Sequence, residues 1–329
     1  MDSPTGRLSR AYHPRLRLVL RAKSRALAQS ASQKNPLQWG YPPTRARTRL
    51  ISDPEAPMHE PYLKAMAALL RRSQPRHDLY TVFGHCMEAI ALAMANSVDL
   101  RQRGPREARY LDIVGRYQPD VLDLFPRILA ELVRALEAGP GDVLGALFHD
   151  LELQNKARGQ FFTPYTLSRF MAGVTIGNPE SVKAIIGDHG FVTATEPACG
   201  AGSMVIALAE AMRDLGINYQ RHLHVTAIDI DPRAIHMAYV QLSLLHVPAH
   251  LMVGNSLSGE KAEHWYTPAH ILGGWNARLA CRQCLEPTGE TRVHVVEAPR
   301  APVPMSHPVP PLCEPCAPTP AMPQQLTLF

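Results

Sequence analysis

The segment 196–203, Glu-Pro-Ala-Cys-Gly-Ala-Gly-Ser, carries the residue types and spacing with the clearest chemical use in this chain. Its two glycines, Gly200 and Gly202, let the backbone approach a ligand closely. An apolar, β-branched run at 191–195 precedes the segment, and a helical pattern that closes at Gly216 follows it. A strand, a glycine turn and a helix N-terminus together direct backbone N–H groups at a negatively charged ligand group. The segment therefore predicts a ligand-binding turn, although a Gly-x-Gly spacing alone does not specify the ligand.

Three further motifs accompany this turn. Gly-Gln-Phe-Phe-Thr-Pro at 159–164 stands just ahead of an amphipathic helix. Asp229 ends the second predicted strand, within Ala-Ile-Asp-Ile-Asp-Pro at 227–232. Gly-Asn-Ser-Leu at 254–257 ends the third. The last two motifs each place a polar side chain at the end of a predicted strand.

The elements that must position these motifs alternate between strand and helix. Such a βαβαβ unit requires right-handed crossovers and a parallel sheet. Its ligand lies at the carboxyl ends of the strands, which is where the turn, Asp229 and Asn255 fall. The predicted strands are 191–195, 222–229 and 249–253, and the predicted helices between them are 202–215 and 232–246.

In their order and spacing, the four motifs resemble the N6-adenine DNA methyltransferases, in particular the large-subunit type of type I restriction–modification systems and its plasmid and integrative-element relatives. The resemblance covers about residues 140–275. It implies an α/β fold: a Rossmann-like S-adenosylmethionine-dependent methyltransferase sheet, partial here and preceded by a helical domain. It also implies a cytoplasmic enzyme that transfers a methyl group from S-adenosylmethionine to N6 of a DNA adenine.

S-adenosylmethionine suits the chemistry of these residues. A carboxylate at Asp229 can accept from both ribose hydroxyls, and Glu196 can meet the cationic part of the methionine moiety. Asn255 offers an amide that matches the adenine edge. Asp231 is expected to be a helix cap, and Cys199 a small turn residue without a nucleophilic role. With the residues that the resemblance adds, the expected cofactor set is Phe161, Thr163, Glu196, Pro197, Ala198, Gly200, Gly202, Asp229 and Asn255, with Phe162 as the alternative to Phe161.

The chain departs from the family after its third strand. The family has an Asn/Asp-Pro-Pro-Tyr/Phe element after the fourth strand, which holds the amine of a flipped adenine and stacks on its ring. Here a fourth strand is predicted at His270–Gly273, and Gly274, Trp275 and Asn276 follow it. These three occupy the degenerate catalytic position, where Trp275 could still offer a stacking face. The catalytic residues are therefore unknown from the sequence.

Three functions remain open at this point. The first is the N6-adenine DNA methyltransferase of restriction–modification or mobile-element type. The second is a catalytically degenerate accessory protein that binds S-adenosylmethionine and DNA and is tethered to the replication machinery. The third is a truncated or frameshifted methyltransferase. Methyl transfer depends mainly on orientation, so the missing element bears directly on the choice.

Composition divides the chain into four parts. Residues 1–50 carry eleven Lys and Arg against one acid, whereas 51–280 hold 20 basic and 24 acidic residues. The basic arm could neutralise nucleic-acid phosphates or be a leader without a role. We predict a basic, disordered arm (1–57), a helical N-terminal domain (58–157), a methyltransferase-like cofactor-binding domain (158–280) and a Pro/Cys-rich tail (281–329).

The helical domain shows five amphipathic segments. The fourth is the clearest, because an apolar stripe recurs every three or four residues behind Pro119. Pro126 should kink this helix or split off its first turns. The predicted helices are 60–72, 79–97, 107–116, 119–137 and 142–157.

The tail has two features of its own. Two CxxC pairs, Cys281–Cys284 and Cys313–Cys316, make the ligand set of a four-cysteine zinc site, although their separation exceeds the usual spacing. The last residues, Gln325–Phe329, resemble the peptide by which bacterial polymerases and repair proteins bind the sliding clamp, or form an inert tail. A specificity subunit or a homodimer partner could cover the edge of the partial sheet. No run of eighteen apolar residues occurs, so no membrane partner is expected.

Overall fold

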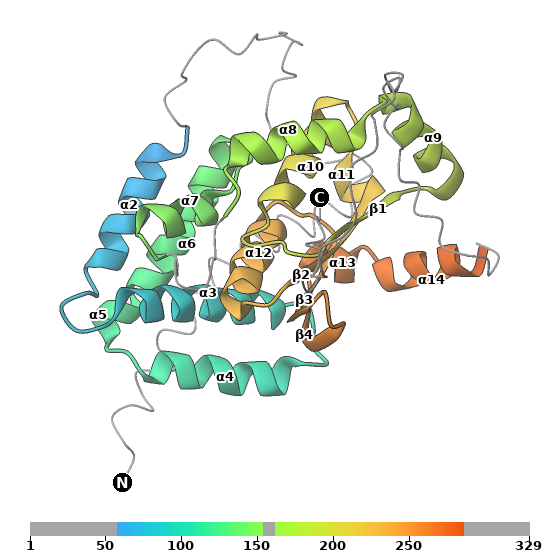
Figure 1. Ribbon diagram of the computed structural model, residues 1–329. Helices are drawn as coiled ribbons and strands as arrows, with labels where there is room; N and C mark the ends of the chain where they lie inside the picture. Colours follow the sequence, from blue (N-terminus) through green and yellow to red (C-terminus); the bar gives the residue numbers. More distant parts are fainter. Residues whose placement is uncertain (1–57, 154–161, 286–329) are drawn as a thin grey trace, which may run out of the picture. The chain divides into compact units, whose positions relative to one another are not determined.

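The structure, a computed structural model, describes residues 58–153 and 162–285 (Figure 1). The predictions made for 1–57, for Phe161 and for 286–329 lie outside the described residues. Every described element belongs to one compact unit that ends at Leu285. No helix in the described ranges has the length and apolarity needed to cross a membrane.

A block of helices comes first, as the apolar periodicity predicts. The helix predicted at 119–137 is split after Leu122, because Pro126 has no N–H to donate to the carbonyl four residues earlier. Asp78 caps α3 by accepting a hydrogen bond from Thr81 N at 2.9 Å. The helices are α2 (Glu60–Arg71), α3 (Leu79–Ala95), α4 (Arg103–Gly115), α5 (Pro119–Leu122), α6 (Leu124–Ala138) and α7 (Val143–Asp150).

Two predicted helix bounds in this block are wrong. The helix predicted to begin at residue 107 begins at Arg103, because Pro105 fits the first turn of a helix and does not interrupt it. The helix predicted to reach residue 157 ends at Asp150. Two residues later Glu152 has a φ of 52°, which no helical residue adopts.

A four-stranded sheet in the order β1-β2-β3-β4 follows, so the α/β class is confirmed. The strands β1 (Val192–Glu196), β2 (Leu223–Asp229) and β3 (Ala249–Asn255) are parallel, and β4 (Glu260–Tyr266) is antiparallel to β3. In Figure 1 helices α8 and α9 lie on the β1 side of the sheet. The helices of this part are α8 (Tyr165–Ile176), α9 (Pro179–His189), α10 (Ser203–Asp214), α11 (Tyr219–His222), α12 (Pro232–Leu244), α13 (Pro268–Leu272) and α14 (Trp275–Leu285).

The fourth strand is not where the sequence predicts it. His270–Gly273 is not a strand, because Thr267 and Pro268 start helix α13: Thr267 Oγ1 accepts from His270 N at 3.3 Å. The fourth strand is the earlier β4, joined to β3 by a turn in which Asn255 Oδ1 accepts from Leu257 N at 2.9 Å. This side-chain turn is a hairpin signal that the sequence contained.

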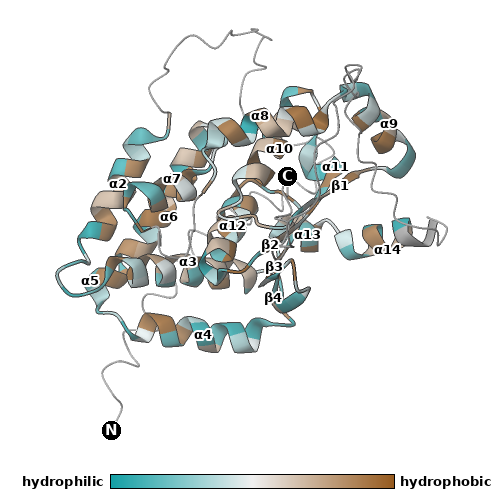
Figure 2. Cartoon of the chain, in the orientation of Figure 1, coloured by the Kyte–Doolittle hydropathy of each residue, from teal (hydrophilic) through white to brown (hydrophobic). Residues whose placement is uncertain are grey.

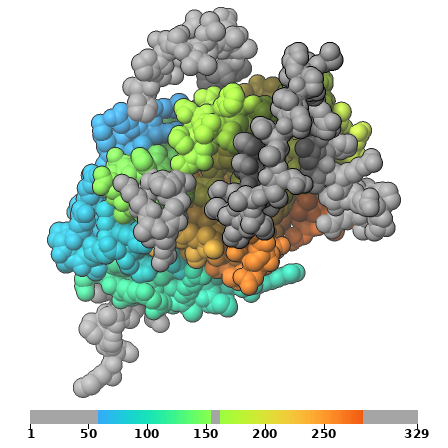
Figure 3. All heavy atoms as spheres, viewed as in Figure 1, coloured from blue at the N-terminus to red at the C-terminus, as the bar shows by residue number. Residues whose placement is uncertain are grey.

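The helical block and the sheet share one hydrophobic core. Helices α3 and α7 pack on α12, and α12 in turn contacts β2 and β3. Polar and apolar faces alternate around most helices (Figure 2). Helix α8, yellow-green in Figure 3, reaches the surface and exposes four apolar side chains there. They follow the spacing of one helix face: Leu167, Phe170, Met171 and Val174.

Candidate functional site

The carboxyl ends of β1, β2 and β3 bring the predicted residues together. β1 ends at Glu196, β2 at Asp229 and β3 at Asn255, and the three strands are hydrogen-bonded neighbours. In the sheet register Glu196 pairs with Ala227, two residues before Asp229. The segment 196–203 then leads from β1 into α10. Three of the four sequence motifs therefore have their polar groups at the carboxyl ends of neighbouring strands.

The turn requires both of its glycines. Gly200 has a φ of 51° and Gly202 a φ of 96°, values that favour glycine. A Cβ on Gly200 would lie 2.8 Å from the ring of Phe162, and one on Gly202 would lie 3.4 Å from Cβ of Ala238. Phe162 therefore closes over the turn, as one of the two predicted phenylalanines. Thr163 is exposed in the next position, ahead of α8.

Backbone hydrogen bonds hold the turn against the second strand. Cys199 N donates to Ile228 O at 2.8 Å, and Gly200 N donates to Asp229 Oδ2 at 2.8 Å. Burial raises the pKa of the Cys199 thiol well above its usual value, and the neighbouring carboxylates add to the shift. A thiol held in its neutral form is a poor nucleophile, in agreement with the structural role predicted for Cys199.

Two carboxylates flank the turn. Asp229 also accepts from Asp231 N at 2.9 Å, and Glu196 Oε1 accepts from Ala198 N at 3.2 Å. Burial raises the pKa of both carboxyl groups, although these backbone N–H groups oppose the shift. Asp229 adds to the shift at Glu196 through charge repulsion. Neither forms an ion pair with a described residue, so the site combines negative charge with partial burial and favours a cationic ligand group.

Asp231 and Asn255 have structural tasks. Asp231 caps α12 by accepting from Arg233 N at 3.0 Å, which confirms the predicted cap. Asn255 uses its side-chain oxygen to accept from Leu257 N and Ser258 N in the hairpin turn. Its role toward an adenine edge therefore stays a prediction. Pro197 and Ala198 are exposed at the rim of the turn.

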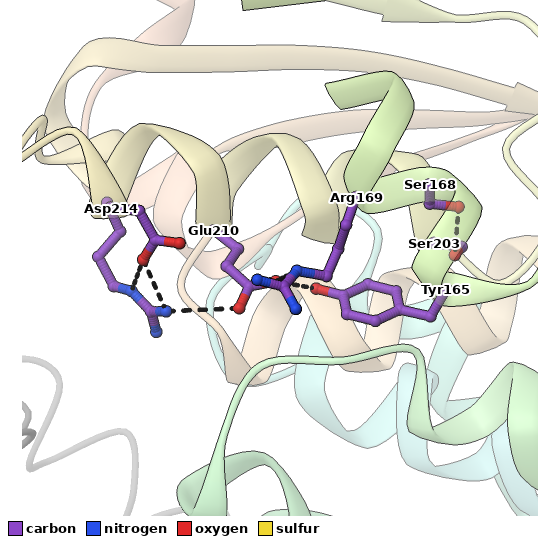
Figure 4. A network of polar contacts seen from close by, with 7 residues as sticks. Tyr165, Ser168, Arg169, Ser203, Glu210 and Asp214 are labelled. Carbon is purple, nitrogen blue, oxygen red and sulfur yellow. Dashed lines mark hydrogen bonds and ion pairs between the residues drawn. The ribbon is translucent and has the colours of Figure 1, made fainter. Parts of the chain in front are cut away.

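A polar network joins α8 to α10 beside the turn (Figure 4). Tyr165 Oη donates to Glu210 Oε2 at 2.8 Å, and Arg169 Nε lies 3.2 Å from the same oxygen. The buried hydroxyls of Ser168 and Ser203 are 2.8 Å apart, and Ser203 is the first residue of α10. No sequence motif indicates this network, because its members lie on two helices and are 35 or more residues apart in the chain.

The groove between these helices is a different place. It has a volume of about 360 Å³ and extends to Asp214 and Leu215 at the far end of α10. Arg169 and Glu210 of the network line it, but Ser203 and the residues of the turn do not.

The degenerate catalytic position lies at the other end of the sheet. The Trp275 ring packs against Phe191, which precedes β1, and against His224 near the start of β2, with centroids 5.1 and 5.2 Å apart. Asn276 Oδ1 accepts from His270 Nε2 at 2.9 Å. Trp275 is buried, so the structure does not place its ring where it could stack on a base beside the turn. Gly274 starts this segment with a φ of 62°.

The described residues contain part of the predicted zinc ligand set. Cys281 is exposed on α14, Cys284 belongs to the same helix, and Cys313 and Cys316 lie outside the described residues. Within 58–153 and 162–285, no three His, Cys, Asp or Glu side chains are grouped to hold a metal. The zinc site stays a prediction.

Residues 141–272 match the protein family described as N-6 DNA Methylase. The resemblance to the N-6 DNA methylases is confirmed over this segment. This methylase segment begins at Gly141 and so includes α7, which lies within the predicted helical domain 58–157. It ends at Leu272, before Gly274–Asn276.

One solved structure is similar at 16% identity with a TM-score of 0.26, "cryoEM structure DrdV-DNA complex". The similarity covers 75% of this chain and 24% of that one, so this chain spans about a quarter of its length. At this TM-score the likeness has no bearing on the function of the methylase segment. Curated proteins gave no match.

Proposed function

We propose that the methylase segment binds S-adenosylmethionine at the carboxyl ends of β1–β3 and serves N6-adenine methylation of DNA. The observation that carries the proposal is the pair of partly buried carboxylates, Glu196 and Asp229, beside a turn held by positive-φ glycines. Such a site suits a ligand with a cationic centre, a ribose and a carboxylate. The Rossmann-like character of the sheet belongs to the same proposal.

Each group of the cofactor has a suitable residue. Asp229 uses one lone pair on each oxygen for a backbone N–H, and a carboxylate has further lone pairs for two ribose hydroxyls. Glu196 would attract the ammonium and sulfonium charges. The first turn of α10 has backbone N–H groups without intrahelical acceptors, which suit the carboxylate. Gly200 and Gly202 keep the backbone free of side chains where these groups meet. When bound, the cofactor supplies an electrophilic methyl group.

Methyl transfer has less support from the described residues than cofactor binding does. Transfer to an exocyclic amine requires a group that orients the base, since orientation provides most of the catalysis. Among the described residues, the segment predicted at that position, Gly274–Asn276, lies at the amino ends of the strands. This placement removes the candidate that the sequence offered for that group, and a DNA-associated protein that binds the cofactor without transferring its methyl group remains the alternative.

An incorporation assay separates the two functions. The full chain is incubated with adenine-rich duplex DNA and S-adenosylmethionine that is labelled in the methyl group. Label in N6-methyladenine that is lost in Asp229→Ala would establish the enzyme. Cofactor binding without incorporation would establish the binding protein. Asp188→Asn, an exposed carboxylate on α9, is a control for the loss of one negative charge.

The remaining partners are proposals that rest on the sequence. DNA is the expected macromolecular partner, with a specificity subunit or a second copy of the chain beside β1. Gln325–Phe329 would bind the sliding clamp, and a peptide of these residues tests that by fluorescence polarisation with purified clamp. Zinc content of the wild type and Cys281→Ser tests the four-cysteine site.

A further inference from the structure

A buried glutamine connects α12, α7 and the glycine turn. Gln241 on α12 is fully buried, and its Nε2 donates to Ala201 O and to Asp142 Oδ1, both at 2.9 Å. Its Oε1 accepts from Leu144 N at 3.0 Å. The side chain therefore uses both amide donors and its oxygen. No apolar residue could make these three contacts.

Asp142 is the second member of this connection. Its Oδ1 accepts from Gly145 N at 2.8 Å and so caps α7. The fit is close, because a Cβ on Gly145 would lie 2.1 Å from Asp142 Oδ2. Burial raises the pKa of the Asp142 carboxyl. The start of α7 is thereby fixed relative to α12.

The turn receives this connection at a defined peptide. Ala201 O is held by Gln241, and the N–H of the same peptide, on Gly202, donates to Cys199 O at 2.8 Å. Because a peptide unit is planar, hydrogen bonds at both ends fix its orientation. That peptide directly precedes the first N–H groups of α10.

A second line of contacts runs in parallel. Phe148 on α7 meets the ring of Phe162 edge-on, with centroids 5.3 Å apart. Phe162 in turn lies against Gly200. Helix α7 thus connects to the turn by two routes. Asp142 and Leu144 bind Gln241, which binds Ala201 O, and Phe148 packs on Phe162, which packs against Gly200.

We propose that Gln241 and Asp142 are positioning residues for the glycine turn, so that the turn has its binding conformation before the cofactor arrives. The proposal rests on the proposed cofactor site and adds the residues that determine its affinity. A turn ordered in advance loses less conformational entropy on binding. Helix α7 is then part of the cofactor site, although none of its side chains is proposed to touch the ligand.

The test compares variants of the full chain by calorimetry with S-adenosylmethionine. Gln241→Met keeps the volume and removes all three hydrogen bonds; we expect roughly a tenfold loss of affinity. Gln241→Glu keeps the oxygen for Leu144 N and removes both donors, and should lose affinity as well. Asp142→Asn retains an acceptor oxygen and should stay within about threefold of wild type.

A core variant separates positioning from stability. Leu132→Ala, in the buried face of α6, lowers the melting temperature without touching the turn. Affinity losses in Gln241→Met and Gln241→Glu that exceed that of Leu132→Ala at a similar melting temperature support the proposal. If both Gln241 variants bind S-adenosylmethionine as tightly as Leu132→Ala does, the proposal is wrong.

Hydrogen exchange keeps the proposal testable if the wild type does not bind the cofactor. In that case the proposed function fails, and amide exchange at Gly200 and Gly202 reports on the turn alone. Faster exchange in Gln241→Met or Gln241→Glu, with unchanged exchange in Leu132→Ala, supports positioning. Equal exchange in all of them contradicts it.

Discussion

The two ends of the parallel strands differ in what their residues are free to do. At the carboxyl ends, Glu196 and Asp229 are partly buried carboxylates without an ion-pair partner among the described residues. At the amino ends, His224, His270 and Trp275 pack together in the core. Burial lowers the pKa of His224 to about 3, so this histidine is neutral at pH 7. The carboxylates at one end can therefore still accept hydrogen bonds from a ligand, whereas the side chains at the other end contact one another.

This difference separates the proposed cofactor binding from the proposed methyl transfer. The residues proposed to bind the cofactor lie together at the carboxyl ends, and hydrogen bonds from Gln241 on α12 and Asp142 ahead of α7 connect to their turn. The residues that the sequence put at the catalytic position instead stabilise the fold, with Arg278 stacked over the Trp275 ring at 3.7 Å. Substitutions at the two ends should therefore affect different measurements.

The largest effect is expected at the amino end. Trp275→Ala removes a buried ring from between Phe191 and His224 and should lower the free energy of unfolding by about 3–5 kcal/mol. Denaturant unfolding measures this loss. Below the new unfolding transition, affinity for S-adenosylmethionine should match wild type. A loss of affinity in the folded variant would mean that Trp275 belongs to the binding site, and the two ends of the strands would then not differ in function.

Asp229→Asn should give the converse result at the carboxyl end. Loss of a charged acceptor for the ribose should weaken S-adenosylmethionine binding roughly 30-fold. The free energy of unfolding should change by only about 1 kcal/mol, because the asparagine keeps one acceptor oxygen. Calorimetry and denaturant unfolding of the same preparation check both numbers. Unchanged affinity would remove Asp229 from the site.

Gly200→Ala tests the turn itself. The positive φ and the nearby Phe162 ring oppose a Cβ at this position, so the turn should be destabilised by about 1–3 kcal/mol. Affinity should fall together with stability, unlike in Trp275→Ala. Gly187→Ala, at a helical glycine on α9 with open space around it, is the matched control: it should leave affinity unchanged and raise stability by about 0.5–1 kcal/mol. Similar behaviour of the two variants would contradict a constrained turn.

The smallest effect is a dependence of stability on pH. His224 and the partly exposed His250, with pKa values lowered to about 3 and about 4, are neutral when folded, whereas an unfolded histidine titrates near 6.5. The unfolded state therefore binds more protons below pH 6.5, and stability falls as the pH drops. From pH 7 to 5.5 we expect a loss of about 1–2 kcal/mol.

A variant isolates this contribution. Burial raises the pKa of Glu196 and Asp229, so these carboxyls oppose the trend by favouring the fold at low pH. Both are present in wild type and in His224→Phe, so the difference between the two pH profiles reports on the histidine. His224→Phe should make the profile shallower between pH 6.5 and 5 by the share of one histidine, because the pKa values of His236 and His250 stay lowered to about 3 and about 4. Parallel profiles would show that His224 does not contribute to the pH dependence.

Local signals predicted much of the geometry of the candidate site. Glycines at 200 and 202, Asp229 at a strand end and Asp231 before Pro232 each act within a few residues, and the structure places them as expected. The splitting of the helix at Pro126 is of the same kind.

Contacts between distant residues could not be predicted in this way. Gln241 and Asp142 are 99 residues apart, and neither belongs to a motif. The apolar run at His270–Leu272 is so short that it fits a strand and a helix equally well. It forms a helix because Thr267 caps it and Pro268 occupies its first position. Because this segment is a helix, Gly274–Asn276 lie at the amino ends of the strands, whereas the predicted strand would have placed them at the carboxyl ends.

Calorimetry of the full chain with S-adenosylmethionine, for wild type, Asp229→Asn and Trp275→Ala side by side, tests the central claim most directly. We predict saturable binding at one site per chain in wild type and Trp275→Ala, and strongly weakened binding in Asp229→Asn. A wild-type chain that is folded by circular dichroism and gives no heat of binding would contradict the claim.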